Sequence, residues 1–488
     1  MTAVCVMVLG TTSGAGKSWI TTALCRYYAR LGLKVAPFKA QNMSNNARVV
    51  VGVNERQGEI GSAQYFQSLA AKAVPNVHMN PILLKPEADT MSQVVLLGSV
   101  NRELSDMPWR ERSEKVWPYI CASLDQLRAE NDVIVIEGAG SPAEINLHAS
   151  DIVNMRVARY AQANCLLVTD IDRGGAFAHL YGTWALLPPQ EQVLIKGFVL
   201  NKFRGDASLL APGPQMLQEM TGIPVLATLP MWYHHGLPEE DGIFDDRTRS
   251  TGTVTTTIAI IAYPRISNLD EFQALKNVPG VRLVWARSPN DCVNADWIVL
   301  PGSKATASDL QWVREQGLDI SISTHAAQGG AVLGICGGLQ MLGQELIDPF
   351  GVDGNAHGLG LLPLVTTFDQ DKTVRHTKVT LGDVTGRWSS LSRLTVEGYE
   401  IHHGQTTLCS ETRVHREVVR EVVSGLAWQN KEGNVLGCYL HGLFEYTAVL
   451  HSLFGFHAST LDDVFDGLAN FLQTYVEHDV LNELIQRK

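Results

Sequence analysis

The sequence predicts an α/β protein with two domains, each a mostly parallel sheet with helices on both faces. The first observation is that short apolar, β-branched runs alternate with helical stretches along both halves of the chain. This alternation is typical of parallel sheets covered on both sides. The second observation is length, because 488 residues are enough for two or three complete cores.

Composition divides the chain near its middle. The stretch 241–257 is acidic and then rich in threonine, which is typical of a linker. We therefore expect a first domain over 1–240, a linker over 241–257, a second domain over 258–450 and a C-terminal helical segment over 451–488.

Strand-like runs occur in both halves. In the first half they are 4–9, 34–39, 94–97, 133–136, 165–169, 194–200 and 225–229. In the second half they are 258–261, 281–285, 297–300, 331–335 and 435–440. Ligands of parallel sheets bind at the carboxyl ends of the strands, so the residues just after each run are the candidates for functional sites.

Composition also excludes several classes of protein. Apolar residues make up 45% and charged residues 18% of the chain, which is ordinary for a soluble protein. The formal charge is −11 without a block of Lys or Arg, so we expect no nucleic-acid partner. No stretch approaches the ~18 apolar residues of a membrane span. Eight cysteines without a C-x-x-C pair argue against zinc and disulfide sites and favour the reducing cytoplasm.

The run 4–9 is followed by Gly10-Thr-Thr-Ser-Gly-Ala-Gly-Lys-Ser and a helical stretch. Strand, glycine loop, Lys-Ser and helix form a P-loop pattern, in which backbone N–H groups bind phosphates, Lys17 reaches the β- and γ-phosphates of ATP and Ser18 suits Mg²⁺. Five residues, and not four, separate Gly10 from Gly16. The candidate ATP-binding residues of this loop are Gly10, Thr11, Gly14, Gly16, Lys17 and Ser18.

Polar residues also follow other strands of the first half. Glu137, directly after the run 133–136, is where a further Mg²⁺ ligand is expected, and Lys39 would offset phosphate charge. Taken singly, each of these side chains is also open to the role of a solvated loop charge. The candidates for binding either the substrate or a metal, which residue types alone do not separate, are Asn42, Asn45, Asp170, Asp172 and Arg173.

Cys336 lies where an apolar run over 331–335 turns sharply at Gly337 and Gly338 into a helical pattern. A strand-to-helix elbow exposes a side chain at the end of a sheet, and the helix N-terminus favours a thiolate there. A buried cysteine in the core is the alternative, but a packing cysteine has no need of flanking glycines.

A cysteine nucleophile needs a base and an oxyanion site. His441 is the first candidate for the base because it follows the run 435–440, and the pair His402-His403 is the second. Either histidine is also open to a structural role. Gly302, just after the run 297–300, and Gly337 are candidates for donating backbone N–H groups to the oxyanion.

The phrase Gly334-Ile-Cys-Gly-Gly-Leu-Gln340, with a later strand-end histidine, resembles the class I (triad) glutamine amidotransferases. The resemblance implies that Cys336 attacks the side-chain amide of glutamine, the nitrogen donor, and releases ammonia. Members of that family usually carry His-x-Glu, whereas this chain has His441-Gly-Leu443, with Glu445 four residues beyond the histidine. The third member of the triad is therefore unassigned.

The first half resembles dethiobiotin synthetase, whose phosphate loop has the same extra residue. That resemblance implies phosphorylation of a carboxylate-like group by ATP and an acyl phosphate intermediate. The residues that match are Gly10, Gly16, Lys17, Ser18, Lys39 and Glu137.

The two halves together resemble the cobyric acid synthase family along essentially the whole chain. The matching stretches are 37–45, 137–147, 169–175 and 263–270. The resemblance implies ATP- and glutamine-dependent amidation of the b, d, e and g carboxylates of adenosylcobyrinic acid a,c-diamide, with Mg²⁺ as cofactor. It implies small-molecule partners: a corrinoid, ATP and glutamine.

Two other interpretations stay open. A sister family amidates the a and c carboxylates of cobyrinic acid, and the stretches 37–45 and 137–147 favour the first family over it. A partitioning-type P-loop ATPase with an inactive glutaminase half belongs to a different class. The loop of such ATPases carries a lysine five residues before the P-loop lysine, where this chain has Thr12.

Overall fold

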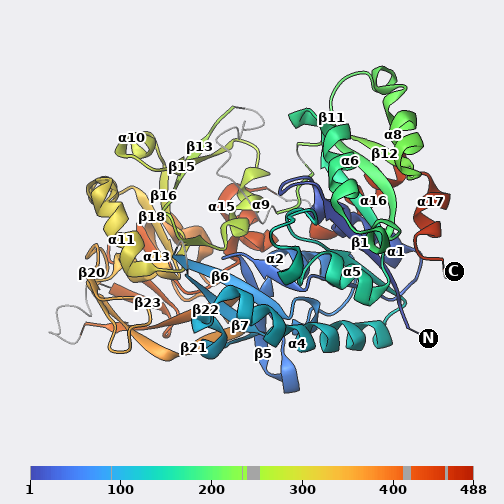
Figure 1. Cartoon of the computed structure of the whole chain (residues 1–488). Coiled ribbons are helices and arrows are strands. Elements are labelled where there is room, and N and C mark those ends of the chain that lie inside the picture. The colour runs from blue at the N-terminus through green and yellow to red at the C-terminus, as the bar shows by residue number, and fades with distance from the viewer. Residues whose placement is uncertain are drawn as a thin grey trace.

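A computed structural model describes residues 2–88, 91–233, 235–238, 253–409, 419–456 and 460–486. The chain forms two α/β domains that lie side by side, the first coloured blue to green and the second yellow to orange (Figure 1). The predicted fold class is confirmed. Most of the expected linker, 241–252, lies outside the described residues.

The first domain is built on a sheet of six parallel strands in the order β12-β11-β10-β1-β9-β2. Its strands are β1 Val4–Gly10, β2 Val35–Phe38, β9 Val133–Glu137, β10 Asn164–Asp170, β11 Ile195–Phe203 and β12 Val225–Pro230. Six of the seven expected runs form this sheet. The seventh, 94–97, is a strand over 94–96, where it ends β7 (Met91–Leu96). Its expected place in the parallel sheet is wrong, because β7 pairs antiparallel with β6 (Ile82–Ala88) in another sheet. The two strands are too close in sequence for a parallel crossover.

Alternation along β1 explains how helices cover both faces of this sheet. Cys5, Met7 and Leu9 share a core with α4 (Trp109–Glu130), α5 (Met155–Ala161) and α6 (Ala176–Leu186). Val6 and Val8 point the other way, into a core with α1 (Lys17–Arg30) and α2 (Ser62–Ala70).

The C-terminal helical segment also packs on the first domain. It contains α16 (Leu461–Tyr475) and α17 (His478–Glu483), whose apolar residues lie in the same core as α1. Arg26 on α1 is buried and pairs with Asp462 and Asp466 of α16. Chain order and spatial order therefore differ: these red helices lie beside blue and green elements in Figure 1.

The second domain contains a seven-stranded sheet in the order β15-β13-β16-β18-β25-β24-β23. Its strands are β13 Thr256–Ile261, β15 Val281–Ala286, β16 Trp297–Leu300, β18 Ala331–Ile335, β23 Val419–Val423, β24 Ala427–Asn430 and β25 Val435–Cys438. The first five in spatial order are parallel, and β24 and β23 are antiparallel additions. All five expected runs are strands of this sheet. Its helices include α11 Thr306–Glu315, α12 Leu318–Ala327 and α13 Gly337–Leu342.

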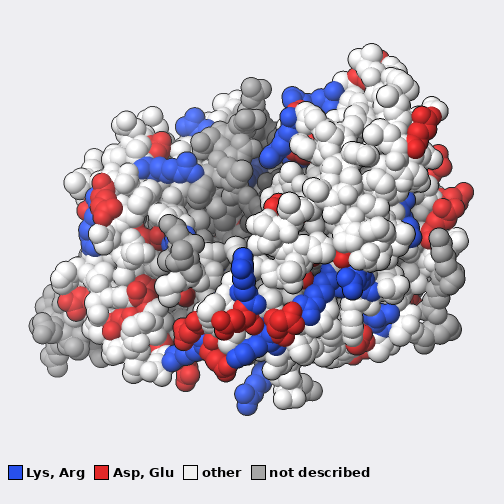
Figure 2. All heavy atoms as spheres, viewed as in Figure 1, with Lys and Arg blue, Asp and Glu red and all other residues white. Residues whose placement is uncertain are grey.

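A long hairpin of the second domain, β21 (Leu364–Thr380) and β22 (Thr395–Leu408), reaches the first domain at β4 (Ala47–Val51) and β5 (Gln57–Gly61). The Lys372 ammonium lies 2.6 Å from the Glu59 carboxylate across this contact. Figure 2 shows acidic and basic side chains closely interleaved along the lower edge of the molecule, where this hairpin lies.

Shorter elements complete the fold. They are β3 Gln41–Met43, β8 Ser99–Val100, β14 Ile266–Ser267, β17 Gly302–Ser303, β19 Glu345–Ile347, β20 Ala356–His357, α3 Arg102–Asp106, α7 Pro189–Gln192, α8 Gly213–Thr221, α9 Gln273–Lys276, α10 Pro289–Cys292 and α15 Thr447–Phe454. Within the described part of the chain, every helix is too short or too polar to cross a bilayer.

Candidate active sites

The predicted phosphate loop joins β1 to α1 and needs its glycines. Gly14 and Gly16 have φ of 70° and 104°, in the left-handed region that favours glycine. A Cβ on Gly16 would lie 2.1 Å from the Asn201 side chain. The Lys17 ammonium donates to the carbonyl of Thr12 in the loop at 3.1 Å and to that of Gly140, beyond the end of β9, at 3.2 Å.

Two residues near the end of β11 hold this loop. Asn201 Nδ2 donates to the Ala15 carbonyl at 2.8 Å, and Lys202 Nζ donates to the Gly14 carbonyl at 2.7 Å. With three of its carbonyls taken by side chains, the loop is left to present its N–H groups to an anion.

Thr11 is not brought into the loop. Its N–H donates to the Val168 carbonyl, and its hydroxyl donates to Thr169 Oγ1 at 2.9 Å. Both groups are engaged at the end of β10. The extra residue of this loop therefore extends the pairing of β1 by one position, and the phosphate-facing turn begins after it.

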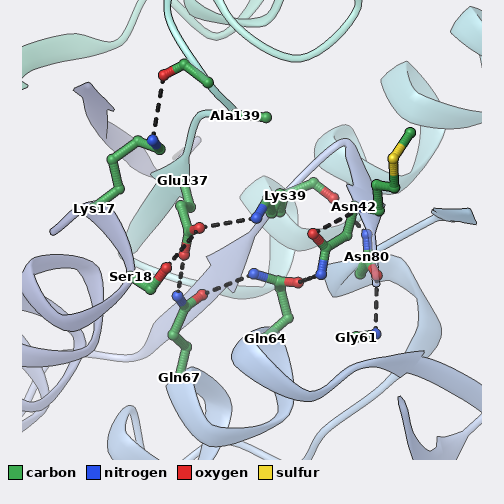
Figure 3. Close-up of polar contacts among 12 residues, drawn as sticks. Lys17, Ser18, Lys39, Asn42, Gly61, Gln64, Gln67, Asn80, Glu137 and Ala139 are labelled. Carbon is green, nitrogen blue, oxygen red and sulfur yellow. Dashed lines mark hydrogen bonds and ion pairs between the residues drawn. The ribbon is translucent and has the colours of Figure 1, made fainter. Parts of the chain in front are cut away.

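Glu137 lies at the centre of a buried polar cluster at the end of β9 (Figure 3). Its Oε1 accepts hydrogen bonds from Ser18 Oγ at 3.0 Å and Lys39 Nζ at 2.9 Å, and its Oε2 accepts one from Gln67. Burial raises the pKa of this carboxyl, but the Lys39 ammonium and the donated hydrogen bonds hold the pKa below its usual value. Two predicted residues, Ser18 and Lys39, thus meet at the ionised carboxylate of a third, Glu137.

A row of amides extends this cluster. Asn42 Nδ2 donates to Gln64 Oε1 at 3.2 Å, and Gln64 Nε2 donates to Gln67 Oε1 at 3.4 Å (Figure 3). Sequence reasoning missed the two glutamines. Their signal was a spacing of three on a helix, which places both on one face of α2.

The remaining candidates of the first half separate in space. Asp170 accepts from Lys202 at 3.1 Å and lies 3.4 Å from Arg173 Nε, beside the phosphate loop. Asp172 accepts from Arg204 Nε at 2.7 Å at the surface. Asn45 lies at neither place: it lines a pocket that contains Cys336.

The donor set of the first site fits Mg²⁺. This ion commonly takes one or two carboxylates and completes its shell with water and phosphate oxygens. Ser18 and Glu137 provide one hydroxyl and one carboxylate in contact, at the loop that would hold the phosphates. In the described ranges, no three His, Cys, Asp or Glu side chains gather into a metal-binding group.

Cys336 occupies the expected elbow between β18 and α13. Its φ is 52°, and its N–H donates to the Cys438 carbonyl at 2.8 Å. A Cβ on Gly338 would lie 1.9 Å from the Leu300 carbonyl oxygen, and one on Gly337 would lie 2.8 Å from Ser303 N. Only glycine fits at either position, because the turn packs directly on neighbouring backbone.

His441 follows β25, which pairs with β18, so the two predicted side chains meet at adjacent strand ends. Its Nδ1 lies 3.3 Å from Glu271 Oε1, while Glu271 Oε2 accepts from the Gly442 N–H at 3.1 Å. Burial lowers the pKa of His441, but the Glu271 carboxylate and the hydrogen-bonded Cys336 sulfur raise it to about 10. Cysteine, histidine and glutamate thus form a contiguous row.

Glu271 was missed because it precedes Cys336 by a long stretch and lies in a short turn, not at a strand end. Glu445, the nearest acid in sequence, points instead to Arg48. The second candidate base, His402, is engaged with the Gly404 carbonyl at 2.8 Å and the Glu400 carboxylate at 3.2 Å.

The two glycines expected at the oxyanion both border this row. A Cβ on Gly302 would lie 2.8 Å from His441 Cε1, and Gly337 begins α13 beside Cys336. Their role as N–H donors stays a prediction.

A pocket opens beside Cys336 and is lined by both domains. Asn45 Oδ1 is buried in its wall and has no hydrogen-bond partner among the described residues. The other polar lining residues are Lys85, Ser267, Asn268, Ser303, Lys304, Thr306, Gln340, Asp353, Lys372, His402, His403 and His441.

Comparisons with known proteins match this arrangement. The family described as CobQ/CobB/MinD/ParA nucleotide binding domain matches residues 6–238, and the family described as CobB/CobQ-like glutamine amidotransferase domain matches residues 257–449. The fold and the two sites therefore define a glutamine amidotransferase fused to a nucleotide-binding domain.

Curated relatives narrow this class. The chain is 70% identical to the cobyric acid synthase of Variovorax paradoxus (strain S110), over 99% of this chain and 100% of that protein. It is also 70% identical to the cobyric acid synthase of Acidovorax sp. (strain JS42), over 98% and 97%, and 68% identical to that of Polaromonas naphthalenivorans (strain CJ2), over 99% and 100%. The chain belongs to the cobyric acid synthase family.

Proposed function

We propose that this enzyme converts adenosylcobyrinic acid a,c-diamide to cobyric acid. It amidates the b, d, e and g carboxylates, using ATP to activate each one and glutamine as the source of ammonia. The observation that carries the proposal is the presence of two assembled sites on one chain, a phosphate loop facing Glu137 and a Cys336-His441-Glu271 row. Family membership supports the choice of substrate.

Activation begins with a carboxylate, whose negative charge repels nucleophiles. The γ-phosphoryl group of ATP passes to a carboxylate oxygen, giving an acyl phosphate and ADP. Lys17 and Lys39 stabilise the transferring phosphoryl oxygens. Ser18 and Glu137 would hold Mg²⁺, which supplies further neutralisation of phosphate charge when bound. Ammonia then attacks the acyl carbon, and phosphate leaves.

Glutamine enters the pocket beside Cys336. The sulfur attacks the side-chain carbonyl, and backbone N–H groups such as those of Gly302 and Gly337 stabilise the oxyanion. His441, held by Glu271, protonates the departing ammonia. Water then releases glutamate from the thioester. The unpaired Asn45 Oδ1 offers an acceptor to the α-ammonium group of glutamine, and the pocket lysines offset its α-carboxylate.

An inactive glutaminase half is not favoured. An inactive half was considered because the usual glutamate two residues after the histidine is absent here. Glu271, from another segment of the chain, instead contacts the His441 ring. We propose domain limits of 1–240 and 258–450, with 451–488 as an addition whose helices α16 and α17 complete the core of the first domain.

Mass spectrometry of the corrinoid tests the proposal. After incubation with ATP, Mg²⁺ and glutamine, the substrate should lose mass in four successive steps, each equal to replacement of OH by NH₂. Amidation of two carboxylates of cobyrinic acid instead would assign the chain to the sister reaction. A corrinoid of unchanged mass would contradict both.

A further inference from the structure

The contact between the domains lies directly beside the glutaminase row. Residues 46–48 of the first domain meet the turn 268–271 of the second. Ala47 N donates to Asn268 Oδ1 at 3.0 Å, and Leu269 N donates to Asn46 Oδ1 at 2.9 Å. Two reciprocal hydrogen bonds therefore fix the segment that carries Glu271.

Arg48 adds a buried charge to this contact. Its guanidinium donates to both oxygens of Glu445, at 2.9 and 2.6 Å, and to Asp270, the neighbour of Glu271. Arg48 and Asp270 are both almost fully buried. Removing the guanidinium would leave the buried carboxylates of Asp270 and Glu271 close to the partly exposed carboxylate of Glu445 without a cation between them, a costly arrangement.

Arg48 also contacts Tyr399, the residue that packs against the His441 ring. Its guanidinium carbon lies 5.0 Å from the centre of the Tyr399 ring, and that ring is stacked on His441 at 5.4 Å. The backbones of Tyr399 and His441 exchange two hydrogen bonds, of 3.2 and 2.9 Å. One arginine of the first domain thus supports both neighbours of the catalytic imidazole.

We propose that Arg48 is a positioning residue for the glutaminase and that this site is complete only when the first domain is docked. Arg48 holds Asp270 and Glu445, which fixes the turn that directs Glu271 to His441. The inference rests on the proposed glutaminase function. It also links the two sites, because residues 39–48 run from the Glu137 cluster to this contact.

The test compares Arg48→Met and Arg48→Lys with Arg26→Met in the full-length enzyme. Arg26 is a matched control, since it too is a buried arginine paired with two carboxylates, but on α1 and far in the fold from Cys336. Glutamate release from glutamine gives kcat and KM, and ammonium-driven amidation reports on the first domain alone.

Arg48→Met should lower kcat for glutamate release about tenfold to a hundredfold through misplacement of Glu271 and His441. Ammonium-driven amidation should stay within about twofold of the unmodified enzyme. Arg48→Lys should recover part of kcat, because lysine restores the positive charge but lacks the planar guanidinium that donates to two carboxylates at once. Arg26→Met should leave the ratio of the two activities unchanged. An unchanged ratio in Arg48→Met would overturn the inference, whereas absence of glutamate release from the unmodified enzyme would overturn the proposed function instead.

A second variant covers loss of folding. Combining Arg48→Met with Asp270→Asn and Glu445→Gln removes the cation and both of its partners, so no unpaired charge is added. This triple variant should fold and still show the lowered kcat, with an altered pH profile of glutamate release. A triple variant with unmodified kcat and pH profile would show that Arg48 only balances charge.

Discussion

The two active sites are held together in different ways. The Glu137 carboxylate accepts hydrogen bonds from Ser18, Lys39 and Gln67, which all belong to the first domain. Around His441, the carboxylate comes from a turn that is itself fixed by Arg48 of the other domain.

This difference implies that the glutaminase site depends on the first domain, whereas the phosphate site does not depend on the second. The phosphate site contains its own cations, Lys17 and Lys39, whose hydrogen bonds to Thr12, Gly140 and Glu137 all lie within the first domain. The glutaminase row depends on the docked first domain. An enzyme built in this way can use external ammonia without its glutaminase, and it holds glutaminase geometry only in the assembled chain.

The largest effect is expected for Cys336→Ala, which separates the two sites completely. Glutamate release and glutamine-driven amidation should fall by about 10⁴-fold or more because the nucleophile is lost, while ammonium-driven amidation continues. Cys438→Ala is the matched control, because Cys438 is a buried cysteine at the end of the neighbouring strand. Burial raises the pKa of the Cys438 thiol to about 12, so this thiol stays protonated. Loss of ammonium-driven amidation in Cys336→Ala would contradict two separable sites.

Glu271→Gln should come next. The amide keeps the shape but removes the charge that orients His441, and kcat for glutamate release should fall about 10²- to 10⁴-fold. Glu445→Gln is the comparison, since Glu445 is the acid nearest in sequence and does not contact His441. If Glu445→Gln lowered kcat more than Glu271→Gln, the assignment of the third residue would be wrong.

Lys17→Ala should affect amidation with either nitrogen source. Loss of its ammonium removes a charge on the transferring phosphoryl group and should lower the rate about 10²- to 10³-fold, as measured by corrinoid product. Glutamate release should persist. Amidation at the unmodified rate with ammonium salts would count against the phosphate role of Lys17.

The pH dependence of glutamate release gives a smaller but diagnostic effect. The pKa of His441 is raised from 6.5 to about 10, so its ion pair stabilises the fold fully below pH 6.5 and is lost as pH rises through about 10. Glutamate release should therefore decline near pH 10, as His441 loses its proton. In Glu271→Gln this alkaline limit should move to lower pH, because the carboxylate that raises the pKa of His441 is gone. An unchanged limit would show that Glu271 does not set the pKa of His441.

The smallest effect is expected for Gln67→Leu, which removes one donor to Glu137 and leaves Lys39 and Ser18 in place. One hydrogen bond to a charged group contributes about 1.5–3 kcal/mol, and part of it is recovered from water. The KM for ATP-Mg²⁺ in ammonium-driven amidation is the quantity to measure, with Gln64→Leu, one residue further along the row, as control.

Sequence reasoning succeeded where chemistry follows a strand directly. Glu137 ends β9, Cys336 directly follows β18, and His441 comes shortly after β25. Lys17 begins α1, after the loop that follows β1. Strand order alone therefore brings each pair to a common edge of its sheet. It failed where long-range docking decides the position. Glu271 lies in a turn whose place depends on Arg48, and no local pattern carries that information.

Asn45 is a second case in which the local sequence does not predict the position of a side chain. It lies in a stretch of polar residues after β2 and was grouped with Asn42 on that basis. The chain between them changes direction, so Asn42 joins the amide row at Glu137 while Asn45 lines the pocket of Cys336. Residue type predicted a polar site for both, and only the path of the backbone distinguishes the two sites.

The packing of α16 on α1 has a consequence for biosynthesis. A ribosome releases the strands of the first sheet well before it makes α16, yet Phe465, Leu468 and Leu472 fill the core beneath α1. Until they emerge, α1 and α2 cover that face of the sheet without the packing of α16 against α1, and the second domain must be synthesised in the meantime. Completion of the ATP-binding half is thereby delayed until α16 (Leu461–Tyr475) has been made, so a nascent chain that stops before α16 should not accumulate as a finished synthetase.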